Sequence, residues 1–291
     1  MKAVGLTNDE LDVEDVEYVR HEDKPLLARL FKPRGKGPFP LIVQLHGGAW
    51  CRGDRSDDTV INEPLAKSGV VVAALDWRMP PVAPYPAALA DINFAIRWLK
   101  TRATDLGGRP EFVGLMGSSS GGHLAMLAAM RPRDSRYSGM SLPAGASRVD
   151  ASVCCVVMCW PVIDPLGRYR YAKKLKESGK PYPALVDLVL PAHDQFWLTE
   201  EAMAEGSPTL ALERGEQVEM PPALYLQGTA DLAHPRPDLE RFVESYRKAG
   251  GHLELELLEG EREGFIGKNP NSSASARAIG KIIEFVHKQI H

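Results

Sequence analysis

The chain has 291 residues, with 35 Lys and Arg against 38 Asp and Glu, which gives a formal net charge of −3. This near balance removes the strongest electrostatic reason to expect a nucleic acid or an anionic membrane as partner. Hydrophobic residues make up 44% and charged residues 25%, as in an ordinary globular protein rather than a disordered or fibrous one. A chain of this length buries enough surface to fold without disulfides or metals.

The first residues carry no targeting pattern. No long apolar run follows Met1–Glu10, as a signal peptide would require. The longest apolar run, Val153–Ile163, is too short to cross a bilayer and contains Pro161. The four cysteines lack the Cys/His spacing of a metal site. We therefore expect a soluble, cytoplasmic protein with no bound metal and no membrane partner.

Short apolar runs bounded by glycine and proline recur along the chain and predict buried strands. The predicted strands are Val13–Arg20, Leu26–Phe31, Leu41–Leu45, Val70–Leu75, Phe112–Met116, Ala151–Cys159, Ala223–Leu226 and Leu253–Leu258. The helical patterns are Asp57–Ser68, Tyr85–Leu106, Gly121–Met130, Asp238–Ala249 and Ala274–Gln289. This alternation predicts an α/β fold with a mostly parallel sheet. We expect one domain over residues 1–291.

The segment Asp164–Pro221 breaks this alternation. An insertion of that size between two predicted strands is more often a cap over a site than a free loop. Its aromatic residues include Phe196 and Trp197, and Trp50 belongs to another candidate motif described below. We expect these three side chains to contribute to substrate binding.

The strongest chemical signal is Gly117-Ser118-Ser119-Ser120-Gly121. It follows a predicted strand and precedes a predicted helix, which is the context that a G-x-S-x-G nucleophile turn requires. The turn is too tight for side chains at the two glycine positions, and it pushes the central hydroxyl outward. The start of the helix favours developing negative charge. The pattern predicts that Ser119 is a nucleophile.

A second motif, His46-Gly47-Gly48-Ala49-Trp50, directly follows the predicted strand Leu41–Leu45. Adjacent glycines leave backbone N–H groups unshielded, so that they can approach a ligand. We take the N–H groups of Gly47, Gly48 and Ala49, together with that of Ser120, as candidates for an oxyanion hole.

These motifs resemble those of the hormone-sensitive-lipase-like esterases of the α/β-hydrolase superfamily. The resemblance includes Asp76-Trp77-Arg78 followed by Pro84-Tyr85-Pro86-Ala87-Ala88, and Gly228-Thr229-Ala230-Asp231 after a predicted strand. It covers the chain from about Leu41 onward. It implies an eight-stranded sheet with helices on both faces, a cap, and cleavage of carboxylic esters without a cofactor. It also implies that Asp231 is the acid that orients the catalytic base.

The expected catalytic histidine is missing. In this family it belongs to a G-x-x-H-G-F stretch after the last strand. The corresponding stretch here is Gly260-Glu261-Arg262-Glu263-Gly264-Phe265, so Glu263 occupies the histidine position. This departure puts an ordinary Ser-His-Asp triad in doubt.

Three hypotheses follow for the base. In the first, another histidine serves: His234, three residues beyond Asp231, leads and His193 is second, whereas we expect His123 to be a buried packing residue. In the second, Glu263 is the base, with a pKa raised by sharing a proton with Asp231. In the third, the protein is no enzyme and binds a small ligand on a hydrolase scaffold. Glu263 is favoured as the base because it occupies the family's histidine position. His234 is favoured because the ordinary imidazole pKa of about 6.5 suits a base near neutral pH.

We therefore expect a serine hydrolase that cleaves a small carboxylic ester through an acyl-enzyme on Ser119. The alternative is the non-catalytic ligand-binding protein. The sequence does not identify the acyl or alcohol group of the substrate. It also leaves open whether the chain forms a homo-oligomer.

Overall fold

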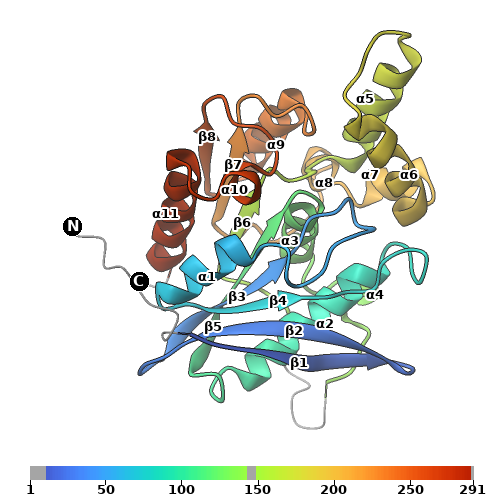
Figure 1. Cartoon of the computed structure of the whole chain (residues 1–291). Helices are drawn as coiled ribbons and strands as arrows, with labels where there is room; N and C mark the ends of the chain where they lie inside the picture. Colours follow the sequence, from blue (N-terminus) through green and yellow to red (C-terminus); the bar gives the residue numbers. More distant parts are fainter. Residues whose placement is uncertain (1–10, 143–148, 290–291) are drawn as a thin grey trace.

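The computed structural model describes residues 11–142 and 149–289, which contain an eight-stranded sheet (Figure 1). The segment Met1–Glu10, in which the sequence shows no targeting pattern, lies outside the described residues. Along the sheet the strand order is β1-β2-β4-β3-β5-β6-β7-β8. The strands are β1 (Leu11–His21), β2 (Lys24–Pro33), β3 (Phe39–Leu45), β4 (Val71–Leu75), β5 (Gly108–Ser118), β6 (Val156–Cys159), β7 (Ala223–Gly228) and β8 (Leu253–Leu258).

The sheet is parallel from β4 across to β8, and antiparallel where β2 pairs with β1 and with β4. Parallel strands end at the same edge, so the loops that follow β3, β5, β6, β7 and β8 meet at one edge of the sheet. Ligands of open α/β sheets bind outside the carboxyl ends of the strands. The predicted oxyanion and nucleophile motifs, the loop of Asp231 and the stretch with Glu263 lie in the loops after β3, β5, β7 and β8.

Helices cover both faces, because side chains alternate along each central strand. In β3, Val43 and Leu45 belong to one hydrophobic cluster, whereas Ile42 belongs to the cluster on the opposite face. The first face packs against α2, α3 and α9, and the second against α1, α10 and α11. These helices are α1 (Thr59–Lys67), α2 (Ala87–Arg102), α3 (Ser120–Met130), α9 (Arg236–Lys248), α10 (Phe265–Lys268) and α11 (Ser273–Lys288).

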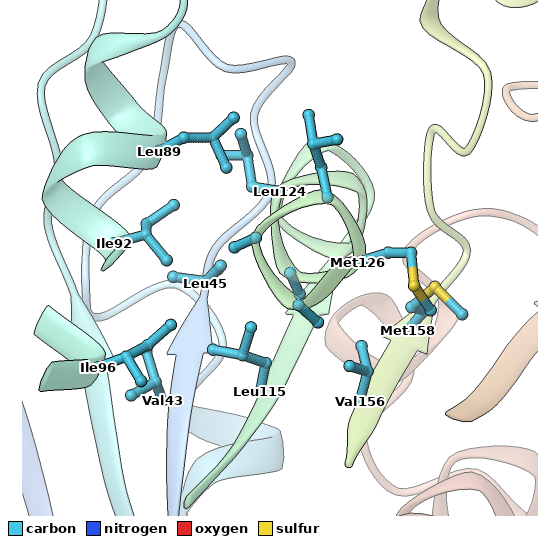
Figure 2. Close-up of a cluster of buried hydrophobic side chains, with 14 of the residues drawn as sticks. Val43, Leu45, Leu89, Ile92, Ile96, Leu115, Leu124, Met126, Val156 and Met158 are labelled. Carbon is cyan, nitrogen blue, oxygen red and sulfur yellow. The ribbon is translucent and has the colours of Figure 1, made fainter. Parts of the chain in front are cut away.

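The centre of the first face fixes the position of α3. Figure 2 shows Leu124 and Met126 of α3 beside side chains of α2, β3, β5 and β6. All eleven residues of α3 are buried, so this helix is surrounded by protein on every side. A helix held in this way gives the turn before it a fixed position.

Helices also fill the segment between β6 and β7. They are α5 (Pro165–Glu177), α6 (Leu185–Trp197), α7 (Glu200–Glu205) and α8 (Pro208–Glu213). Figure 1 shows α5 and α6 projecting beyond the sheet. These two helices share a small hydrophobic cluster that includes Ala172, Val186 and Val189. The segment predicted as a cap thus forms helices, and its role as a cover stays a prediction.

Each predicted strand and helix has a counterpart of the same kind in the structure, although several ends are shifted. The predicted strand Ala151–Cys159 is shorter, because regular pairing begins only at Val156. The one-turn helices α4 (Ser135–Ser138) and α10 were not predicted, since four residues give too little periodicity to detect. In the described parts of the chain, no helix has the length and apolar character needed to cross a membrane.

Candidate active site

Ser119 lies in a strained turn between β5 and α3. Its φ is +49°, a left-handed conformation that side chains rarely adopt. Both glycines of the motif are sterically required. A Cβ at Gly117 would lie 2.3 Å from the carbonyl oxygen of Gly121, and one at Gly121 would lie 2.1 Å from that of Leu45. The turn therefore presents the Ser119 hydroxyl at the carboxyl edge of the sheet.

Ser119, His234 and Asp231 form a continuous chain of contacts. The Oγ atom of Ser119 lies 3.3 Å from Nε2 of His234. The Nδ1 atom of His234 lies 2.9 Å from Oδ2 of Asp231. An N–H at Nδ1 donates to the carboxylate in this arrangement and leaves Nε2 free to accept the serine proton. The order nucleophile, imidazole and carboxylate is the one that serine hydrolases use.

The loop after β7 holds both Asp231 and His234. The Oδ1 atom of Asp231 accepts backbone N–H groups from Ala233 at 2.7 Å and from His234 at 3.1 Å. The side chain of Gln227 in β7 donates to the His234 carbonyl at 3.0 Å. Burial acts to raise the pKa of Asp231, but the neighbouring His234 and these hydrogen bonds outweigh it and lower the pKa. Asp231 is therefore ionised at neutral pH and can stabilise a charged imidazole.

Glu263 lies at the same site, but its carboxylate forms no hydrogen bond with the Ser119 hydroxyl. It borders a cleft of about 180 Å³ that Ser119 also lines, together with Gly47, Gly48 and Trp160; we call this the Ser119 cleft. The Glu263 carboxylate accepts from Nζ of Lys268 at 3.1 Å. Within the described residues it makes no hydrogen bond to Ser119, His234 or Asp231.

The other candidate histidines are bonded elsewhere. His193 has an Nδ1 atom 2.7 Å from the Val189 carbonyl. His123 accepts from the indole N–H of Trp50 at 3.2 Å, and its Nε2 lies 2.8 Å from the Gly206 carbonyl. Burial lowers the pKa of His193 to about 3 and that of His123 to about 4. Both are packing residues.

The predicted oxyanion loop lies against the nucleophile turn. A Cβ built at Gly47 would be 3.4 Å from the Ser119 Cβ. Gly48 has a φ of +109°, and its own Cβ would lie 2.2 Å from the Arg52 carbonyl oxygen. In residues 11–142 and 149–289, the N–H groups of Gly48, Ala49 and Ser120 have no hydrogen-bond acceptor. They are free to donate to a developing oxyanion.

The predicted substrate contacts of Trp50, Phe196 and Trp197 require correction. Their exposed fractions are 0%, 0% and 1%. The rings of Trp50 and Phe196 stack at 5.4 Å between centroids, and Trp197 meets Trp50 edge-on at 5.5 Å. These aromatics join the oxyanion loop to α6, and they present no surface to a ligand. Sequence alone does not distinguish an aromatic side chain that lines a pocket from one that is packed between two elements.

Asp58 is a residue at the site that the sequence did not reveal. Its Oδ2 atom accepts from the Ser118 hydroxyl and from the Gln44 amide, each at 2.7 Å. Burial raises its pKa to about 6. Asp58 lines the Ser119 cleft and ties α1 to the nucleophile turn. Nothing in its sequence surroundings marks it, since an Asp near a helix start is usually a cap.

A known family model matches the part of the chain that contains most of this site. The BD-FAE family model matches residues 30–235, which include the oxyanion loop, the nucleophile turn and the loop of Asp231 and His234. Esterase LipC of Mycobacterium tuberculosis is 28% identical over 263 residues, which are 86% of this chain and 59% of LipC. Carboxylesterase NlhH of the same species is 25% identical over 87% of this chain and 75% of NlhH. LipM, a probable carboxylic ester hydrolase, is 26% identical and matched over 46% of its length. The chain thus spans about half the length of LipC and LipM.

Solved structures show the same fold. An esterase of Pyrobaculum calidifontis superposes with a TM-score of 0.77 at 24% identity, over 96% of this chain and 85% of that one. The thermophilic esterase Est2 of Thermogutta terrifontis superposes with a TM-score of 0.73 at 25% identity, over 95% and 92%. The matched family model and these superpositions lead to one conclusion: the chain belongs to the BD-FAE family and has the α/β-hydrolase fold.

Proposed function

We propose that the protein is a serine carboxylesterase that cleaves a small carboxylic ester through an acyl-enzyme on Ser119. The observation that carries the proposal is the contact chain from Ser119 through His234 to Asp231. It supplies an imidazole although Glu263 occupies the family's histidine position. The relatives named as esterases support the same reaction class.

In the first half of the reaction, the Ser119 hydroxyl attacks the ester carbonyl carbon and gives its proton to Nε2 of His234. Asp231 stabilises the imidazolium that results. The carbonyl oxygen becomes an oxyanion, to which Gly48, Ala49 and Ser120 offer N–H groups. Collapse of this intermediate breaks the ester bond, and His234 returns the proton to the leaving alcohol.

In the second half, a water molecule attacks the acyl-enzyme while His234 again accepts the proton. As the bond between the acyl carbon and the Ser119 oxygen breaks, His234 returns this proton to that oxygen, and the acid product leaves. No cofactor is needed for these steps. The small volume of the Ser119 cleft, about 180 Å³, favours a small group on the substrate. We keep residues 164–221 as the proposed cap over this site.

A fluorophosphonate probe tests the proposal, because it reacts covalently with an activated serine. Thermogutta terrifontis esterase 2, a structural relative at 25% identity, has been observed phosphonylated by sarin. The wild type and Ser118→Ala are expected to be labelled, and Ser119→Ala is not. Loss of 4-nitrophenyl acetate hydrolysis should follow the same pattern. An unlabelled wild type without esterase activity would favour the ligand-binding alternative.

A further inference from the structure

Arg168, in the first turn of α5, is a buried charge without a bonding partner. The residue is 4% exposed. Its Nη1 atom has no accessible surface and no hydrogen-bond partner. The second buried arginine of the described chain, Arg97, instead donates to Asn93 at 2.8 Å and to the Met140 carbonyl at 2.8 Å. Because an unpaired buried charge is costly, the isolation of Arg168 calls for a partner outside the chain.

The guanidinium of Arg168 lies beside the proposed catalytic base. It shares a small cavity with His234, Pro235 and Asp238; we call this the Arg168 cavity. Its volume of about 10 Å³ is close to the space of one water molecule. Burial lowers the pKa of Arg168 to about 10, so the side chain stays charged at neutral pH.

Three carboxylates act on this charge from a distance. The negative charge of Asp231 raises the pKa of Arg168 most, followed by Glu263 and then Asp238. None of them forms an ion pair with it among the described residues. The strongest of these effects comes from the acid that holds His234. Arg168 therefore places a positive charge from α5 next to the proposed triad.

We propose that Arg168 is a specificity-determining residue that binds a carboxylate carried by the ester substrate. This inference rests on the proposed esterase function. A guanidinium offers a planar pair of donors that matches a carboxylate. The Ser119 cleft is bordered by Asp57, Asp58 and Glu263, which repel an anion. The Arg168 cavity is also lined by two carboxylates, Asp164 and Asp238, but unlike the Ser119 cleft it has a cationic side chain in its lining. The guanidinium is therefore the group at this site that can attract a substrate carboxylate.

Two features of the Arg168 cavity shape this binding. The cavity has room for about one water molecule, so a carboxylate can enter only if α5 moves outward. Asp238 faces the same cavity, and burial followed by the nearby Asp164 raises its pKa to about 7. This shift favours the neutral form of Asp238, which weakens its repulsion of an anion.

The test compares charged and neutral esters in matched pairs. For a carboxylate on the acyl side, the pair is mono-4-nitrophenyl glutarate and 4-nitrophenyl pentanoate. For one on the alcohol side, it is 4-acetoxybenzoate and 4-methylphenyl acetate. The variants are Arg168→Met and Arg168→Lys. The control is Arg170→Met, on the same helix, whose side chain is 64% exposed and pairs with Glu200.

In one of the two pairs, Arg168→Met is expected to lower the charged-to-neutral ratio of kcat/KM by about tenfold or more. Arg168→Lys should restore part of this ratio, and Arg170→Met should leave it at the wild-type value. Unchanged ratios in both pairs would overturn the inference while the esterase function stands. So would an equal loss with both members of each pair, which would make Arg168 a positioning residue.

A binding measurement separates this inference from the esterase function. Calorimetric titration with glutarate and with benzoate needs no turnover. If Ser119 proves unreactive, tighter binding of either anion by the wild type than by Arg168→Met still supports an anion site. Equal binding, or none, would overturn it.

Discussion

Trp197→Ala should destabilise the fold far more than it alters substrate preference. The indole is 1% exposed and meets Trp50, Phe196 and Tyr85 at centroid distances of 5.5, 5.0 and 4.7 Å. A tryptophan buries roughly 200 Å², and about 25 cal/mol per Å² gives about 5 kcal/mol. Partial collapse of the cavity reduces the expected loss to about 3–5 kcal/mol.

The assay is urea denaturation of the wild type, Trp197→Ala and the neighbouring control Leu198→Ala. Leu198 is 64% exposed, so its removal should cost less than about 0.5 kcal/mol. Rates with acetate, butyrate and hexanoate esters of 4-nitrophenol report the acyl preference. The reasoning is refuted if Trp197→Ala costs under about 1 kcal/mol and shifts the acyl preference, because Trp197 would then line the substrate pocket.

Three further predictions concern the site. Asp58 has a pKa of about 6 against an ordinary 3.8, so the folded state holds its proton more tightly than the unfolded state does. Wild-type unfolding free energy should therefore fall by about 2–3 kcal/mol more than that of Asp58→Asn between pH 4 and 7; parallel curves would contradict this. Gly48→Ala should lower kcat about a hundredfold, because its Cβ would lie 2.2 Å from the Arg52 carbonyl oxygen; retained activity with an unchanged circular dichroism spectrum would exclude that loop from catalysis. Asp231→Asn should lower kcat by about 10⁴ because the imidazole loses its orienting carboxylate, and a loss below about tenfold would point to another acid.

Most of the fold could be predicted because its signals are local. Runs such as Leu41–Leu45 and Val70–Leu75 are apolar, short and bounded by glycine or proline, and they became β3 and β4. The nucleophile turn was equally predictable. Contacts within a few residues and with the adjacent strand leave no room for side chains at its two glycine positions. The sequence pattern alone therefore identifies the turn.

The remaining features depend on contacts between distant parts of the chain. Position favoured Glu263 as the residue near Ser119, and Glu263 does border the same cleft. Only the three-dimensional structure shows that the His234 ring is the group within 3.3 Å of the hydroxyl. The isolation of Arg168 is likewise invisible in sequence, where an Arg in a polar helix is usually solvated.

The identity of the base is the central claim, and one comparison tests it most directly. The measurement is kcat/KM for 4-nitrophenyl acetate in the wild type, His234→Ala and Glu263→Gln, with each variant shown to be folded. The contact of His234 with Ser119 predicts a fall of about a thousandfold or more in His234→Ala and retention of most activity in Glu263→Gln. The reverse result, with His234→Ala active and Glu263→Gln inactive, would contradict the account and make Glu263 the base.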